Sequence, residues 1–287
     1  MTTKSKFGLA MLAVLAVSGG SMALADKQTA PSNTAVLKET NLLVLNSEVN
    51  GESVGNVISK AKQLDADLTK KNSKEPLYLY LKTPGGSIQA GLELIEALRG
   101  LGRPVNTITA FAASMGFQIA QNLDQRLILD KGVLMSHHAY GSFEGAFGGT
   151  SPSQVDQRKH LWDQVVTELD QKTVDRTNGK QTLASYQKLY DKEVWMTGHE
   201  SVAGGFADAI TKVRCDSSIS GVDTKHASFM GMDIAYDIDK CPINSSPQNV
   251  RLNAAGATKE YSDAVKSQFL STYQSQFSTS VAHPYFW

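Results

Sequence analysis

Three short segments carry residue types that acyl-transfer chemistry requires. Residues 84–87 read Pro-Gly-Gly-Ser after an apolar run, and residues 112–116 place Ser114 among small neighbours. Two adjacent histidines, His137 and His138, follow along the chain. A serine nucleophile, a nearby base and a glycine-rich backbone that can hold an oxyanion are the parts of a serine hydrolase. The pattern therefore favours acyl transfer, and a peptidase in particular.

Each segment also has an ordinary structural interpretation. Ser114 stands where a strand gives way to a helix, so it can act as the helix N-cap, although the same place gives its hydroxyl the positive end of the helix dipole. Gly85 and Gly86 fit a tight turn, and a phosphate-binding loop is disfavoured because no Gly-Lys-Ser/Thr follows them. Adjacent strand residues point to opposite faces, so only one of His137 and His138 can face the serine, and a shared metal is disfavoured.

The carboxylate that would orient the base must come from later in the chain. Asp191 and Glu193 precede residues 194–197, Val-Trp-Met-Thr. Either carboxylate can accept a hydrogen bond from an imidazole. A solvated run of charges explains the two residues as well, so the choice between them stays open at this point.

Alternating patterns predict the elements that must position these residues. Apolar runs predict strands at residues 41–45, 77–81, 105–110, 126–129, 133–136 and 206–210. Helical spacing predicts helices over residues 54–68, 88–98, 114–121, 155–173 and 182–190, with a mobile glycine-rich loop at residues 141–153. This alternation is typical of an α/β fold with mostly parallel strands.

The N-terminal residues predict a cleavable export signal. Lys4 and Lys6 precede a short apolar run at residues 7–17, and Ala-Leu-Ala at residues 23–25 forms a small-residue cleavage site. We therefore expect a periplasmic or secreted protein. Removing the two lysines from 28 basic residues leaves a net charge of −2 against 28 acidic residues. Such a near-neutral surface gives no argument for nucleic acid as a partner.

The C-terminal part of the chain differs in character. Cys215 and Cys241 are its two cysteines, and in an exported protein they predict a disulfide, worth about 3 kcal/mol, around an irregular loop of about 27 residues. Apolar and aromatic residues recur at every fourth position from Tyr261 to Phe277, which predicts an amphipathic helix. The chain ends in the aromatic residues 283–287. We expect this tail to dock on its own body or to contact a neighbouring subunit.

Taken in order, these residues resemble the proteolytic subunit of the Clp protease, the ClpP family. The resemblance runs from about Leu43 to Ile210 and rests on residues 43–59, 77–91, 112–116, 133–141 and 191–197. It implies a crotonase-like α/β spiral of β-β-α units with a protruding helical handle at about residues 154–190. It also implies self-assembly into rings and serine endopeptidase activity without a cofactor or a metal.

The resemblance assigns roles to the candidate residues. It places the nucleophile on Ser114 and the base on His137 rather than His138. It places the third triad member on Glu193, where the family has aspartate, so Asp191 remains the alternative acid. These three roles form a Ser-His-acid triad.

The oxyanion donors that the resemblance implies are the backbone N–H groups of Gly86 and Met115. No family counterpart is recognised for the C-terminal residues. The expected organisation is a signal peptide at 1–25, a flexible segment at 26–40, a catalytic domain at 41–212 and a C-terminal extension at 213–287.

The predicted export signal changes the expected partners. The cytosolic family works with an ATP-driven unfoldase, whereas an exported chain has no ATP supply, so we expect an ATP-independent homo-oligomer that cleaves unfolded polypeptides. One alternative is a non-catalytic ClpP-fold scaffold that binds peptides, which the glutamate at position 193 and the altered flank of His137 would suit. A crotonase-fold enzyme acting on acyl-CoA is a third possibility, but it would leave Ser114 and His137 idle.

Overall fold

The structure is a computed structural model that describes residues 34–139, 152–244, 246–253 and 258–275. The predicted signal peptide, almost all of the glycine-rich loop and the aromatic C-terminus lie outside these ranges. Within them, no helix combines the length and the apolar character needed to cross a bilayer.

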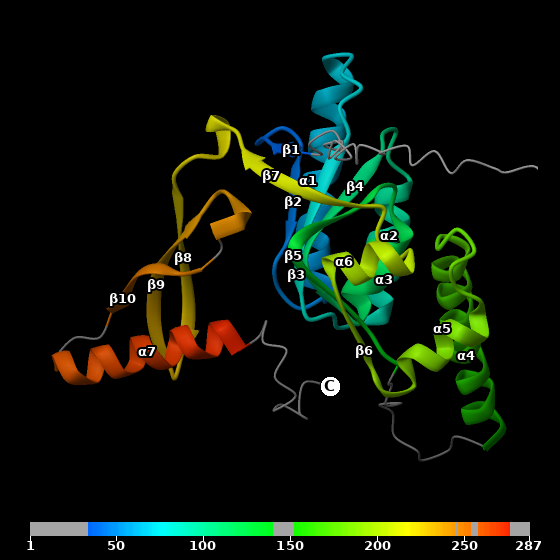
Figure 1. Cartoon of the computed structure of the whole chain (residues 1–287). Coiled ribbons are helices and arrows are strands. Elements are labelled where there is room, and N and C mark those ends of the chain that lie inside the picture. Colours follow the sequence, from blue (N-terminus) through cyan, green and yellow to red (C-terminus); the bar gives the residue numbers. More distant parts are fainter. Residues whose placement is uncertain (1–33, 140–151, 245, 254–257, 276–287) are drawn as a thin grey trace, which may run out of the picture. The chain divides into compact units, whose positions relative to one another are not determined.

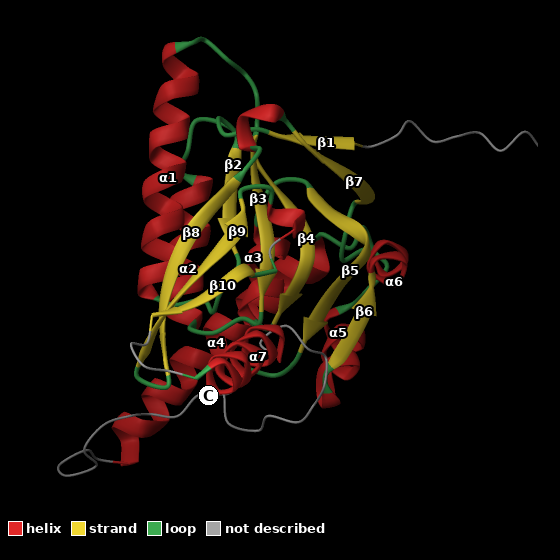
Figure 2. Cartoon of the chain, turned by 90° about the vertical axis from the view of Figure 1, so that its left-hand side faces the viewer, coloured by secondary structure: helices red, strands yellow, loops and turns green. Residues whose placement is uncertain are grey.

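A largely parallel sheet forms the framework of the fold (Figure 2). Its order is β1 (Thr34–Leu37), β7 (Ala209–Cys215), β5 (Arg126–Ser136), β4 (Val105–Ala113), β3 (Leu77–Thr83) and β2 (Leu42–Leu45), with every neighbouring pair parallel. The short β6 (Val194–Thr197) pairs antiparallel with the end of β5. The alternation of strands and helices confirms the predicted α/β fold class.

Three helices lie in the crossovers between the parallel strands. They are α1 (Gly51–Lys70), α2 (Ile88–Arg99) and α3 (Met115–Asn122). The apolar stripe predicted for α1 is buried almost throughout, because Ala61, Leu64 and Leu68 are at most 5% exposed. These side chains join strand residues such as Leu79 and Leu81 in one core cluster. Periodicity therefore identified the face of α1 that meets the sheet.

A helical segment separates β5 from β6 (Figure 1). It contains α4 (Pro152–Asp175), α5 (Leu183–Leu189) and the short η1 (Tyr190–Lys192). We call residues 152–192 the handle. Both of its predicted helices are present, and α6 (Gly198–Gly204) follows β6.

Two local predictions differ from the structure. Residues 26–40 were predicted to be a flexible lead-in, yet β1 occupies Thr34–Leu37 and pairs with Lys212–Cys215 of β7. That pairing is invisible locally because the partner strand comes so much later in the sequence. The strands predicted at 126–129 and 133–136 form the single strand β5, with a register shift against β4 between them.

The C-terminal part forms a second, antiparallel sheet. After η2 (Ser217–Ile219), the strands β8 (Val222–Phe229), β9 (Met232–Asp239) and β10 (Gln248–Asn253) pair with β9 in the centre, and η3 (Pro242–Asn244) lies between the last two. The predicted amphipathic helix is α7 (Lys259–Ser275). Its residues Val265 and Phe269 pack with Ile234 of β9 in a cluster of their own.

The two cysteines are joined as predicted. The Cys215–Cys241 disulfide connects the end of β7 to the residues after β9. The prediction of an irregular loop between them is wrong, because β8 and β9 form a regular hairpin there. Its two-residue turn, Met230 and Gly231, has positive φ at both positions, as the common hairpin turn requires.

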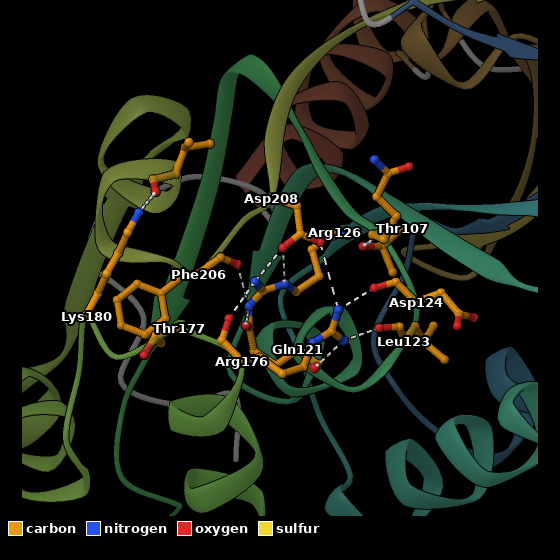
Figure 3. A network of polar contacts seen from close by, with 12 residues as sticks. Thr107, Gln121, Leu123, Asp124, Arg126, Arg176, Thr177, Lys180, Phe206 and Asp208 are labelled. Atoms are coloured by element: carbon orange, nitrogen blue, oxygen red, sulfur yellow. Dashed lines mark hydrogen bonds and ion pairs between the residues drawn. The ribbon is translucent and has the colours of Figure 1, made fainter.

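A polar network ties the start of β5 to its surroundings (Figure 3). The Arg126 side chain, 4% exposed, donates to the Asp208 carboxylate at 2.5 Å and to Gln121 Oε1 at 2.8 Å. It also donates to the carbonyl of Arg176 at 2.9 Å. The Arg176 side chain in turn donates to carbonyls at the end of α3, among them Gln121 O at 2.9 Å. This network anchors α3 at the end opposite Ser114.

Candidate active site

The register of three neighbouring strands brings the sequence motifs together. Thr83 of β3 pairs with Ala112 of β4, and Ala113 of β4 pairs with Met135 of β5. The segments that follow these residues therefore leave the sheet at the same edge. Segments from neighbouring strands lie about 5 Å apart there. Gly85 and Ser114 are the first candidate residues on that edge.

Ser114 has a strained backbone that directs its side chain away from an ordinary cap. Its φ is 54° and its ψ is −120°, and its side chain makes no capping hydrogen bond to α3. Its N–H donates to Met135 O at 3.0 Å, which fixes it against β5. A strained serine at a sharp strand-to-helix turn is the arrangement that exposes a nucleophilic hydroxyl. The N-cap interpretation of Ser114 therefore loses its main support.

Gly85 and Gly86 pack closely against neighbouring backbone at the Ser114 turn and at Val49. A Cβ added at Gly85 would lie 2.7 Å from Ser114 Cβ and 2.9 Å from Met115 N. Gly86 is held beside Val49, which donates to Gly85 O at 2.7 Å and accepts from Ser87 N–H at 2.8 Å. Only glycine fits both positions, because φ is 98° and 141° and the added atoms would meet backbone. Gly85 thus lies against the backbone of Ser114 and Met115, and the role of the Gly86 and Met115 N–H groups as oxyanion donors stays a prediction.

The antiparallel pairing of β5 and β6 brings the backbone of His137 and Glu193 close together. Ser136 pairs with Val194, so His137 and Glu193 directly adjoin the last paired residues of the two strands. Their electrostatic interaction agrees with this placement. Burial lowers the pKa of His137, whereas the Glu193 carboxylate raises it. The half-buried imidazole is thus kept neutral at lower pH than an ordinary histidine.

The alternative acid has a different partner. Asp191 lies 3.2 Å from His138 Nε2, and both side chains are largely exposed. The structure therefore pairs His137 with Glu193 and His138 with Asp191. Sequence reasoning missed Trp195, whose Nε1–H donates to Glu193 Oε2 at 3.2 Å. No local sequence signal identified this contact, because Glu193 precedes β6 and has φ 82°.

Backbone strain is concentrated in the same place. In the part of the chain that the structure describes, three of the six non-glycine residues with positive φ are asparagines, which tolerate it. Ser114 and Glu193 are among the other three, with φ of 54° and 82°. Strain of this kind costs about 1–3 kcal/mol and persists mainly where function requires it. No cluster of three or more potential metal ligands occurs among the described residues.

The arrangement suits acyl transfer, and comparison with known proteins agrees. A sequence model of the Clp protease family matches residues 26–214. The chain belongs to the Clp protease family. The family match covers the parallel sheet and the handle and ends just before Cys215. The antiparallel sheet and α7 therefore lie outside the part that defines the Clp protease family.

Several curated Clp protease subunits are also similar in sequence to the chain. Proteins named "ATP-dependent Clp protease proteolytic subunit" from Streptococcus pyogenes serotype M5 (strain Manfredo), Streptococcus equi subsp. equi (strain 4047) and Streptococcus equi subsp. zooepidemicus (strain H70) are 30% identical to it over 178 residues. The alignment covers 61% of this chain and 86% of each relative. Homology to the Clp proteases thus supports a peptidase function.

Proposed function

We propose that the protein is an ATP-independent serine endopeptidase of the bacterial cell envelope that cleaves unfolded polypeptides. Ser114 is the nucleophile, His137 the base and Glu193 the orienting acid. The observation that carries this proposal is the register, because β4, β5 and β6 deliver these residues to one edge of the sheet from distant parts of the sequence.

The proposed reaction follows the two steps of acyl transfer. Ser114 Oγ attacks the scissile carbonyl as His137 takes its proton, and the N–H groups of Gly86 and Met115 receive the developing oxyanion. His137 then gives that proton to the leaving amine, and an acyl-enzyme remains. Water, deprotonated by His137, attacks this ester, and the proton returns to Ser114 as the peptide acid leaves. Glu193 stabilises the imidazolium during both steps.

Glu193 is preferred over Asp191 because of its surroundings. Its charge acts on His137, and Trp195 holds its carboxylate. Asp191 is engaged with His138 instead.

Export, independence from ATP and self-association belong to the same proposal. The N-terminal 25 residues have the pattern of a cleavable signal, and the envelope offers no ATP for an unfoldase. The relatives are named as subunits, which agrees with an oligomer.

Labelling with a fluorophosphonate tests the catalytic proposal. The purified mature protein should be labelled at Ser114, as mapped by mass spectrometry, and both Ser114→Ala and His137→Ala should abolish labelling. A generic peptide and casein then serve as substrates without ATP, with trypsin as the positive control. A folded protein that neither labels nor cleaves would instead be a non-catalytic peptide-binding scaffold.

A further inference from the structure

One aromatic side chain of the handle reaches the helix that begins after the proposed nucleophile. Tyr186 of α5 is fully buried, at 0% exposure. Its ring stacks on Phe117 with centroids 6.3 Å apart and an interplanar angle of 19°, and it meets Phe206 at 5.7 Å. Phe117 lies on α3, three residues after Ser114. The ring therefore supports the helix whose first turn holds the nucleophile.

The hydroxyl of the same side chain reaches the strand that carries the proposed base. It lies 2.8 Å from Ser136 Oγ in a buried hydrogen bond. Ser136 is the last residue of β5 and directly precedes His137. Gln118 of α3 and Thr173 of α4 also interact with this hydroxyl. Tyr186 thus contacts the segments of both proposed catalytic residues.

The handle holds the other flank of His137 as well. The rings of Tyr186 and Tyr190 meet edge to face with centroids 4.8 Å apart, and Tyr190 donates a hydrogen bond to the buried Asp170 of α4. The Tyr190 ring also meets the ring of His138 at 4.6 Å, nearly perpendicular to it. Residues on both sides of His137 are therefore braced by the handle.

We infer that Tyr186 is a positioning residue, whose ring fixes α3 and whose hydroxyl fixes the end of β5, so that it sets the distance between Ser114 and His137. This inference rests on the proposed function. A nucleophile and its base must stay within hydrogen-bond reach, and misplacement by about 1 Å costs up to about 100-fold in rate. A substitution can remove the hydrogen bond between Tyr186 and Ser136 while the packing of the Tyr186 ring is kept.

Tyr186→Phe is the appropriate test because it deletes the hydroxyl and keeps the ring. We expect kcat for peptide cleavage to fall about tenfold with KM unchanged, because the ground-state contacts with substrate remain. Ser136→Ala should lower kcat in the same direction, and the double variant should be no worse than Tyr186→Phe alone, since Tyr186→Phe already removes the bond to Ser136. Tyr236→Phe, which removes a partly buried hydroxyl from the C-terminal sheet, is the matched control and should leave kcat unchanged.

A second readout does not depend on turnover. The ring signals of His137, followed by NMR across pH, should change in titration midpoint and tautomer population in Tyr186→Phe and not in Tyr236→Phe. If Tyr186→Phe does not fold, the same measurements are made on Ser136→Ala, which removes a smaller group from the same hydrogen bond.

The outcomes separate the two proposals. An active wild-type protein whose kcat and His137 titration are untouched by Tyr186→Phe overturns the positioning role and leaves the peptidase in place. A wild-type protein without labelling or turnover overturns the peptidase, and the His137 titration then decides the positioning role alone.

Discussion

Replacing Gly85 with alanine should disable the proposed nucleophile by contact alone. The new Cβ would lie 2.7 Å from Ser114 Cβ, which is 0.7 Å inside the 3.4 Å at which ordinary van der Waals contact begins. It would also lie 2.6 Å from Ala113 O and 2.9 Å from Met115 N. All three atoms belong to backbone or to the nucleophile itself, so no flexible side chain can move aside.

The expected loss of activity follows from this 0.7 Å overlap. If the Ser114 turn gives way by most of 0.7 Å, the hydroxyl leaves the reach of its base, and we expect kcat/KM to fall about 100-fold. Alanine at φ 98° strains the folded backbone and should lower the free energy of unfolding by about 1–2 kcal/mol. Peptide cleavage and the rate of fluorophosphonate labelling measure the first effect, and thermal unfolding measures the second.

Gly221 offers a matched control for the backbone cost. Its φ is 93°, close to that of Gly85, but an added Cβ would meet nothing within 4 Å. Gly221→Ala should therefore lose a similar backbone contribution and keep full activity. A folded Gly85→Ala protein that labels Ser114 at the wild-type rate would refute the argument, because the contact would then have no consequence for the nucleophile.

Four further predictions concern charged groups and the disulfide. Because burial lowers the pKa of His137, the acid limb of the kcat/KM profile should have its midpoint below about 6.5. Glu193→Gln should move this midpoint lower still, since the carboxylate raises that pKa. Asp208→Ala leaves the buried Arg126 charge uncompensated and should lower the free energy of unfolding by about 3 kcal/mol, as measured by urea unfolding. This is the low end for a buried ion pair, because the Asp208 carboxylate is 33% exposed. An unchanged urea midpoint would contradict this prediction. Cys215→Ser opens the disulfide and should cost the C-terminal sheet about 3 kcal/mol. In limited proteolysis of this variant, the C-terminal sheet should be cleaved sooner than residues 26–214, which match the family. Equal resistance of the two parts would contradict the prediction.

Most elements within residues 26–214, the part that matches the family, could be predicted from the sequence because their signals are local. The apolar strands and the stripe of α1 reflect burial on a parallel sheet, and the small residues around Ser114 reflect a close approach of backbone. Such features leave a mark on a few consecutive residues. The class of fold and the residues brought to the candidate site could therefore be anticipated.

The elements that were missed depend on partners elsewhere. β1 is short and gains its stability from β7, and β8 is almost wholly exposed, so neither has a strong apolar pattern. The Met230-Gly231 turn was the one local sign of the hairpin. The choice between Asp191 and Glu193 was equally non-local, because the register of β6 against β5 decides which carboxylate faces His137.

The placement of the handle between β5 and β6 has a consequence for folding. The proposed base and its acid become neighbours only once β6, which follows the whole handle in the sequence, pairs with β5. Pairings between such distant segments form late, because loop closure must precede the contacts that reward it. A nascent or partly folded chain therefore lacks the proposed triad, so the order of folding keeps a chain from cleaving polypeptides before it has folded itself.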